Sequence, residues 1–263
     1  MTLTYTDETH AYSLDGRRVV NVTSVLSGGL PKSALVNWAA RSVAEHVMTN
    51  PDEVRALWAM GWEPGAKALA AIPDQRRDEA AARGTKFHDL AEIISGGELV
   101  HVPPALADMA RGFVAWLDRF QPEVVLTETA VASRRYRYAG RFDLLAYVTT
   151  AEHGRRLCML DVKTSRAVYG DTALQCAAYA KAEFYVDGAG VEQPVPTVDG
   201  MGVIHVTDQG TELYDLGPVE PAWSEFLACL ATYRGTQRRR NLLGPPAEPA
   251  GVPDVPAFTL ESA

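Results

Sequence analysis

The sequence predicts an α/β fold in which a helical N-terminal region precedes a central sheet. Two observations support this: apolar residues recur with a helical period as far as Phe120, and from Val124 the pattern becomes that of extended strands. A length of 263 residues with 47% hydrophobic content suits one large domain, or a domain with an added lobe. We therefore divide the chain into a hairpin and helical region (1–122), a core of strands and helices (123–243) and a Pro-rich tail that we expect to be flexible (244–263).

The N-terminal region is expected to begin with a β-hairpin and to continue as helices. Asp15 and Gly16 supply the positive φ angles of a tight turn between two short extended segments. Ser33 can cap one helix, and Asn50 begins a capping-box pattern with Pro51 at the first helical position. The expected strands are 11–14 and 19–22, and the expected helices are 33–46, a segment from Pro51, 74–94 and 104–120.

Three extended segments with short connections, followed by a helix, predict an antiparallel meander in the core. A loop with Pro and Gly separates that helix from two further strands, and a last helix precedes the tail. The expected strands are 124–132, 138–148, 157–164, 202–206 and 212–216, and the expected helices are 172–185 and 221–234.

Composition excludes several classes of protein. No run of about eighteen apolar residues occurs, and no basic segment followed by an apolar one begins the chain, so we expect a cytoplasmic protein with no membrane partner. Three widely separated cysteines argue against a disulfide framework and against a compact zinc site. The net charge of −8 is unfavourable for binding nucleic acid, although basic clusters interrupt the acidic chain. Ordinary solvated faces explain those clusters equally well.

Two carboxylates and a lysine lie on strands that we expect to be neighbours. Asp161 and Lys163 are two positions apart, so both point into one site while Val162 faces the other side. Asp143 presents a second carboxylate from the preceding strand, and a divalent cation held by both carboxylates and the Val162 carbonyl would offset the burial of these charges. A metal beside an ammonium group suits phosphodiester hydrolysis. We expect the site to be open to solvent; a surface Asp–Lys pair is the alternative.

Four motifs and a leader share their order and spacing with a known family. The motifs are residues 84–88 (GTKFH), 140–143 (GRFD), 161–163 (DVK) and 175–179 (QCAAY), and the leader covers 12–26. In these motifs the chain resembles the PD-(D/E)XK nuclease superfamily, especially its RecB-like and phage exonuclease-like members. The resemblance implies a restriction-endonuclease-like mixed central sheet flanked by helices. It also implies a Mg²⁺- or Mn²⁺-dependent DNA nuclease, and among such nucleases we expect an exonuclease that acts on DNA ends or single strands. Three cysteines cannot supply the four thiolates of the iron–sulfur members, so we expect no iron–sulfur cluster.

The resemblance also implies roles for individual residues. Lys163 would be the catalytic cation that holds or deprotonates the attacking water, beside the catalytic carboxylates. His88 would be a further metal ligand, and its imidazole suits manganese better than magnesium. Gln175 and Tyr179 lie four apart on one expected helix and would position Lys163 or contact the substrate. The alternative is that Tyr179 packs in the core and Gln175 lies on the surface.

Three more residues are candidates for orienting ligands or binding substrate. Glu92 lies four positions after His88 and would orient it, or would simply be a solubilising charge. Glu128 lies on the first core strand, where the family often has an acidic residue, although an exposed polar strand explains it equally well. Arg141 shares a strand face with Asp143 and could reach a phosphate or a carboxylate.

Contacts with DNA are expected from cations that bind phosphates and from a tyrosine that stacks on a base. The expected residues are Lys86, Arg135, Tyr136, Arg137 and Arg166. A single-strand annealing or recombination protein is the expected partner, in a bacterial or phage-infected cell. Two alternatives stay open: a non-catalytic DNA-binding or recombination-assembly subunit of the same fold, and a structural or host-interaction protein, which the acidic charge favours.

Overall fold

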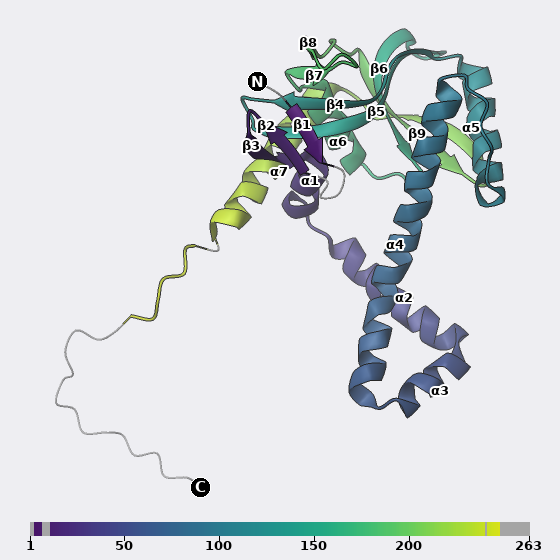
Figure 1. The fold of residues 1–263 in the computed structure, drawn as a ribbon, viewed down its shortest axis with the longest axis vertical. Coiled ribbons are helices and arrows are strands. Elements are labelled where there is room, and N and C mark those ends of the chain that lie inside the picture. Colours follow the sequence, from purple (N-terminus) through teal and green to yellow (C-terminus); the bar gives the residue numbers. More distant parts are fainter. Residues whose placement is uncertain (1–2, 7–10, 240, 248–263) are drawn as a thin grey trace.

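The computed structural model describes residues 3–6, 11–239 and 241–247. These residues form a mixed α/β protein with a curled, ten-stranded mixed sheet and helices (Figure 1). The strands are β1 (Leu3–Thr6), β2 (Ala11–Leu14), β3 (Arg17–Asn21), β4 (Glu123–Ser133), β5 (Tyr138–Thr150), β6 (Gly154–Lys163), β7 (Phe184–Val186), β8 (Glu192–Pro194), β9 (Gly200–Thr207) and β10 (Gly210–Asp215). The helices are α1 (Val22–Gly29), α2 (Ser33–Thr49), α3 (Pro51–Ala59), α4 (Trp62–Ser95), the 3-10 turn Pro104–Leu106, α5 (Ala107–Phe120), α6 (Asp171–Ala180) and α7 (Val219–Arg239).

The central strands follow the predicted meander, and their neighbours make the sheet mixed. β4 pairs antiparallel with β5, and β5 pairs antiparallel with β6. β9 runs parallel to β6, and α6 lies in the long connection that a parallel pair requires. The N-terminal hairpin turns at Asp15 and Gly16, whose φ angles are 53° and 73°, and β3 joins the sheet parallel to β5.

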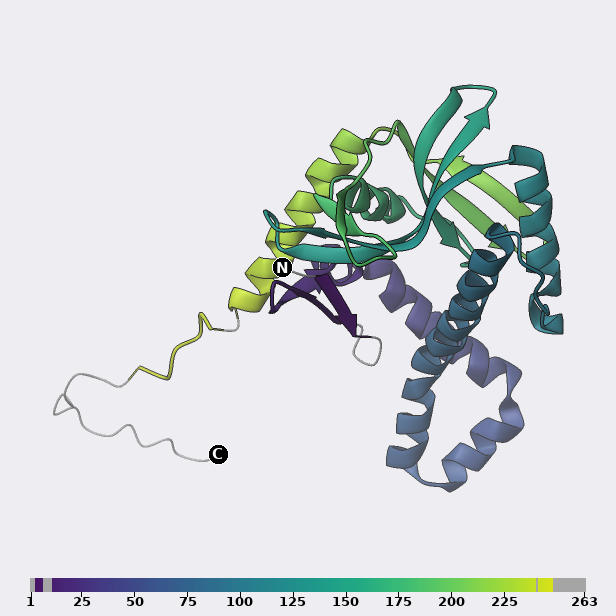
Figure 2. The same ribbon diagram turned by 45° about the horizontal axis from the view of Figure 1, so that its top comes forward.

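Helices cover both faces of the central strands (Figure 2). α5 and the C-terminal half of α4 pack on one face in a buried cluster that includes Leu160 and Val162. α1, α6 and α7 cover the other face, where Met159 and Phe226 are buried in a second cluster. Successive residues of β6 therefore alternate between two cores, and Asp161 lies on the α6 side.

An arm made of α2, α3 and the first half of α4 stands away from the sheet (Figure 1). α2 buries only Ser42, α3 buries no residue, and the first half of α4 buries Gly65 and Ile72. Trp58 and Trp62, where α3 leads into α4, are 80% and 87% exposed. Most helical stability in proteins comes from packing an apolar face, so the arm gains little of it.

Three predicted boundaries are wrong. The strand predicted to end at Val22 ends one residue earlier, because Oδ1 of Asn21 accepts the Ser24 N–H at 2.6 Å and caps α1. The helix predicted to reach 185 ends at Ala180, because the following segment pairs with β4 as β7. The helix predicted from 74 begins already at Trp62 and continues through Pro73 with one backbone hydrogen bond fewer.

The remaining predicted elements are present with ends shifted by a few residues, whereas β1, α1, β7 and β8 were not predicted. Residues 248–263 of the predicted tail lie outside the described residues. Among the helices of the described chain, none combines the length and the apolar character needed to cross a membrane.

Candidate functional site

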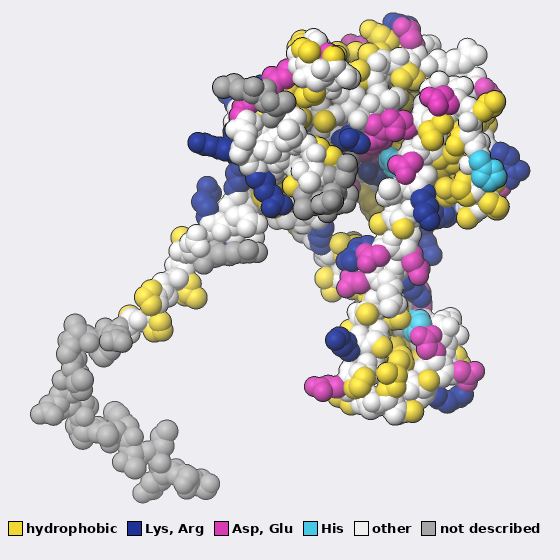
Figure 3. All heavy atoms as spheres, in the orientation of Figure 1, with side chains coloured by type: hydrophobic (Ala, Val, Ile, Leu, Met, Phe, Trp, Pro, Cys, Tyr) yellow, Lys and Arg dark blue, Asp and Glu magenta, His cyan; other side chains and the backbone are white. Residues whose placement is uncertain are grey.

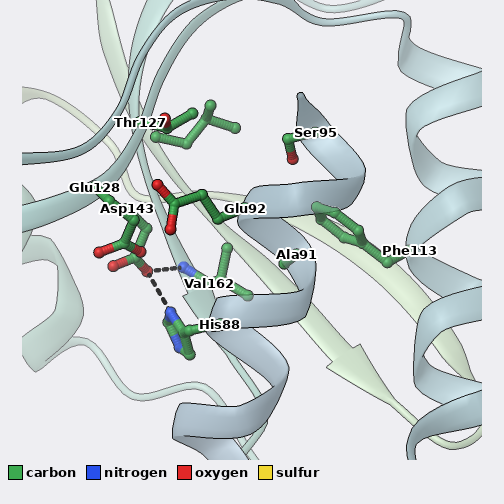
Figure 4. A pocket seen from close by; sticks show the side chains of 10 residues that line it. His88, Ala91, Glu92, Ser95, Phe113, Thr127, Glu128, Asp143 and Val162 are labelled. Carbon is green, nitrogen blue, oxygen red and sulfur yellow. Dashed lines mark hydrogen bonds and ion pairs between the residues drawn. The ribbon is translucent and has the colours of Figure 1, made fainter. Parts of the chain in front are cut away.

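Three potential metal ligands converge where the C-terminal half of α4 meets β4 and β5 (Figure 4). His88 comes from α4, Glu128 from β4 and Asp143 from β5, and one ligand atom of each lies within 4.8 Å of the others. Nδ1 of His88 is 3.5 Å from Oδ2 of Asp143. Figure 3 shows acidic and histidine side chains gathered on the surface at this junction. Two carboxylates and one imidazole form a donor set that suits Mn²⁺ and accommodates Mg²⁺.

The backbone of β4 places Glu128 opposite Asp143. The pairs on either side, 127 with 144 and 129 with 142, leave these two residues facing each other across the ladder. Glu128 has a φ of 41°, a left-handed conformation that costs an ordinary residue about 1–3 kcal/mol. Strained backbone at a residue aimed at two other potential ligands is typical of functional sites.

Close packing of α4 against β6 sets the position of His88. A Cβ atom at Gly84 would lie only 3.2 Å from Oγ1 of Thr164. Glycine therefore allows this turn of α4 to approach the region just after β6. His88 follows about one turn later and enters the site from that turn.

Burial shifts all three potential ligands toward their neutral forms. It raises the pKa of Asp143 to about 6, although the Val162 N–H donates to its Oδ2 at 2.6 Å. Burial, with the charge of Asp143, raises the pKa of Glu128 to about 8. Burial lowers the pKa of His88, so the imidazole is neutral and able to bind a metal at neutral pH. A divalent cation would favour the ionised carboxylates, and these donors therefore fit one.

A second polar group lies on the other face of β6, against α6. Oδ2 of Asp161 is 2.7 Å from Nζ of Lys163, and Oδ1 accepts a hydrogen bond from Nε2 of Gln175 at 2.8 Å. The same Nε2 is 3.2 Å from the Tyr179 hydroxyl. Nζ of Lys163 is 3.5 Å from Oε1 of Gln175. The four side chains from the two predicted motifs thus form one connected network.

Asp161 is only 2% exposed, so the expectation that it is open to solvent is wrong. Asp161 lies near the C-terminal end of β6 on the face that α6 covers, and this packing is the physical reason. Burial raises the pKa of Asp161 to about 7, which Asp143 reinforces and Lys163 opposes. Burial lowers the pKa of Lys163, but its pairing with Asp161 outweighs burial and the net pKa is raised. The two polar groups also interact: the charge of Asp161 acts on His88, and that of Lys163 acts on Asp143.

Glycine at the start of the 140–143 motif makes room for Tyr179. A Cβ atom at Gly140 would lie 2.5 Å from Cε1 of the Tyr179 ring. A larger residue would push the ring away, and with it the hydroxyl that contacts Gln175. Gly140 therefore positions the network around Asp161 without taking part in it.

Three other predicted residues border the potential ligands. Glu92 and Val162 line a hollow that the three potential ligands also line. Figure 4 shows the Glu92 carboxylate beside Glu128 and Asp143 rather than beside His88. Val162 contributes its N–H to Asp143, whereas its carbonyl was the predicted ligand. Nη1 of Arg141 lies 3.8 Å from Oε2 of Glu128.

The predicted DNA contacts in the β4–β5 turn lie away from the site. Arg135, Tyr136 and Arg137 belong to this turn, roughly 20 Å along β5 from Asp143. The Tyr136 ring packs edge-on against Trp223, with 5.3 Å between ring centroids. This tyrosine therefore has a packing role, and the structure does not bring the turn to the potential ligands.

The other two predicted DNA contacts are close to site residues in the sequence. Lys86 is exposed on α4 two residues before His88, and this spacing turns its side chain to the opposite side of the helix. Arg166 is exposed in the loop that follows Lys163. The sequence did not single out Asp89, whose negative charge raises the pKa of both His88 and Glu128; its place directly after His88 was the available signal.

No protein-family model matches this chain, and no curated protein matches it. The resemblance of its motifs to the PD-(D/E)XK nucleases stays a prediction. The chemistry of the site is therefore inferred from the positions and charges of its own residues.

Proposed function

We propose that this protein is a Mg²⁺- or Mn²⁺-dependent deoxyribonuclease with a restriction-endonuclease-like core. The convergence of His88, Glu128 and Asp143 carries the proposal, because three elements bring three metal-binding side chains to one point. An ion pair between Asp161 and Lys163 lies at the end of the next strand. The charge of Lys163 acts on Asp143 and that of Asp161 acts on His88, so the two groups are electrostatically linked across β6. Cation ligands linked to an ammonium group in this way form a suitable site for cleaving a phosphodiester bond.

His88, Glu128 and Asp143 would hold the cation, which when bound polarises a phosphate and lowers the pKa of a water molecule. The Val162 N–H fixes Oδ2 of Asp143, the atom that also faces His88. The neutral imidazole leaves a nitrogen lone pair for the metal. These residues therefore set the position of the reacting phosphate.

Lys163 is the catalytic cation of this proposal. Its ammonium is held by Asp161 and Gln175, and its raised pKa keeps it charged. A fixed positive charge stabilises the negative charge that grows on the phosphate oxygens during attack. Gln175 and Tyr179 act as positioning residues, because they hold Asp161 and through it Lys163.

The proposed substrate is DNA with free ends or single strands, processed in recombination, repair or phage replication. The resemblance of the motifs to exonuclease-like members supports this choice. Arg166, three residues after Lys163, is an exposed cation that could bind a phosphate. The proposed setting is the cytoplasm of a bacterial or phage-infected cell, with a single-strand annealing or recombination protein as partner.

The test incubates the purified protein with labelled linear, circular and single-stranded DNA in Mg²⁺, Mn²⁺ or EDTA. We expect metal-dependent loss of the linear and single-stranded substrates while circular duplex DNA stays intact. Lys163→Ala should lower the rate at least about 100-fold. The control Lys181→Ala, which breaks a surface pair with Glu220, should keep the rate within about twofold.

Full turnover by Lys163→Ala would show that the assigned role is wrong. Equal cleavage in EDTA and Mn²⁺ would refute the metal site. DNA binding without cleavage under every condition would support the non-catalytic subunit instead.

A further inference from the structure

We infer that a tyrosine-lined hollow beside the metal site binds an unpaired nucleotide of single-stranded DNA next to the cleaved bond. This inference rests on the proposed nuclease function and specifies its substrate. The hollow lies between the N-terminal strands, the start of α1, β5 and α6. Its lining includes Tyr5, Tyr12, Asn21, Thr23, Arg141 and Tyr179.

The hollow shares walls with both parts of the candidate site. Arg141 lies two residues before Asp143 on β5 and is 3.8 Å from Oε2 of Glu128. Tyr179 also lines the hollow, and its hydroxyl contacts Gln175, the residue that holds Asp161. A ligand in the hollow would therefore touch residues that border the metal ligands and the lysine network.

The lining offers the two kinds of group that bind an unpaired nucleotide. The ring of the partly exposed Tyr5 packs on the buried Tyr12, with ring centroids 4.7 Å apart and a tilt of 39°, so Tyr5 presents a supported aromatic surface for a base. The Arg141 guanidinium carbon lies 5.4 Å from the centre of the Tyr5 ring. A guanidinium has five N–H donors, and the long contact with Glu128 leaves donors for a phosphate.

The arrangement discriminates between single-stranded and duplex DNA. Inside a duplex both faces of a base are stacked on neighbours, and a terminal base is still held by its pair and by one neighbour, so a base must leave the duplex to enter the hollow. Stacking of a base on an aromatic side chain contributes about 1–3 kcal/mol and does not depend on sequence. The hollow therefore favours single strands or frayed ends of any sequence over blunt duplex ends.

Steady-state kinetics on a single-stranded oligonucleotide test this subsite. We expect Tyr5→Ala to raise KM about tenfold, the change that about 1.4 kcal/mol produces, with kcat kept within about twofold. Arg141→Gln should raise KM by a similar factor, and its kcat should also fall because Arg141 lies beside the proposed metal ligand Glu128. Tyr5→Phe, which keeps the ring, should restore the original KM. The matched control is Arg18→Gln, an exposed arginine of the same hairpin region that does not line the hollow. On a blunt duplex, Tyr5→Ala should change KM less than about twofold.

Binding is measured separately in the Lys163→Ala background, by fluorescence anisotropy of a labelled oligonucleotide with Mn²⁺ present. Tyr5→Ala should raise Kd about tenfold, while calorimetry shows unchanged Mn²⁺ binding. If the original protein neither cleaves nor binds DNA, the nuclease proposal fails and the subsite fails with it. If the protein cleaves DNA but Tyr5→Ala and Arg141→Gln keep the original KM and Kd, only the subsite is overturned.

Discussion

The two ends of α4 have the same helical backbone but opposite surroundings. Toward the C-terminus, Phe87 and Leu90 are 0% and 4% exposed, whereas Trp62 at the N-terminus is 87% exposed. His88 lies in the buried half, where carboxylates from β4 and β5 meet it. The helical period can place His88 on one face of the helix, but only packing against the sheet determines where that face points. Packing of the C-terminal half of α4 on the sheet therefore positions the three potential ligands, and none of them comes from the arm.

The largest expected effect is on stability at the sheet end. Phe87→Ala should lower the free energy of unfolding by about 3–5 kcal/mol, because it removes a fully buried ring from the cluster shared by α4, α5 and the sheet. Urea unfolding followed by circular dichroism measures it. A loss below about 1 kcal/mol would mean that packing stabilises the C-terminal end of α4 no more than its exposed N-terminal end.

The next effect is on activity and compares two histidines. His88→Ala should reduce Mn²⁺-dependent cleavage at least about 100-fold, since it removes a ligand from the proposed metal site. The control is His46→Ala on the arm, where His46 pairs with Glu53 at 3.4 Å. We expect its cleavage rate to stay within about twofold. Equal losses in both variants would place the arm in the catalytic unit.

A third prediction concerns the pH dependence of the metal-free protein. Burial raises the pKa of Asp143 from 3.8 to about 6 and that of Glu128 from 4.5 to about 8. A carboxyl with a raised folded-state pKa contributes stability that is complete below its unfolded pKa and is lost as the pH rises through the folded pKa. The loss should therefore run from about pH 4 to about pH 8. The lowered pKa of His88 acts in the opposite direction and offsets only part of it.

In EDTA we expect the free energy of unfolding to be at least about 2 kcal/mol lower at pH 8 than at pH 5, after the opposing effect of His88. Mn²⁺ should restore most of this difference at pH 8, because a cation stabilises the ionised carboxylates. Hydrogen exchange should localise the change to the sheet end of α4. Unfolding curves that coincide at the two pH values would contradict the raised pKa values of these two carboxyls.

Much of the lysine network could be predicted from side-chain periods. Alternation along a strand places Asp161 and Lys163 on one face, and four-residue spacing on a helix brings Gln175 to Tyr179. Both rules act within one element. The burial of Asp161 could not be predicted, because it depends on how closely α6 packs over β6.

The potential metal ligands depend on relations between elements, which the sequence does not display. Glu128 meets Asp143 only because of the register of β4 on β5, which shifts between Val124 and Leu126. Its positive φ is also not typical of a glutamate within a strand. The start of α4 was misplaced for a local reason: Pro73 is typical of a helix boundary, yet the helix continues through it.

The smallest expected effect is on the arm and completes the comparison within α4. Trp62→Ala should change the free energy of unfolding by less than about 0.5 kcal/mol, because an 87% exposed side chain loses few contacts when truncated. The same urea titration used for Phe87→Ala measures it, at a low and a high protein concentration. A loss near 2 kcal/mol that grows with concentration would show that another copy of the chain covers the arm in solution, since association stabilises by mass action. A similar loss independent of concentration would mean that the chain itself covers Trp62, and the contrast between the two ends of α4 would no longer hold.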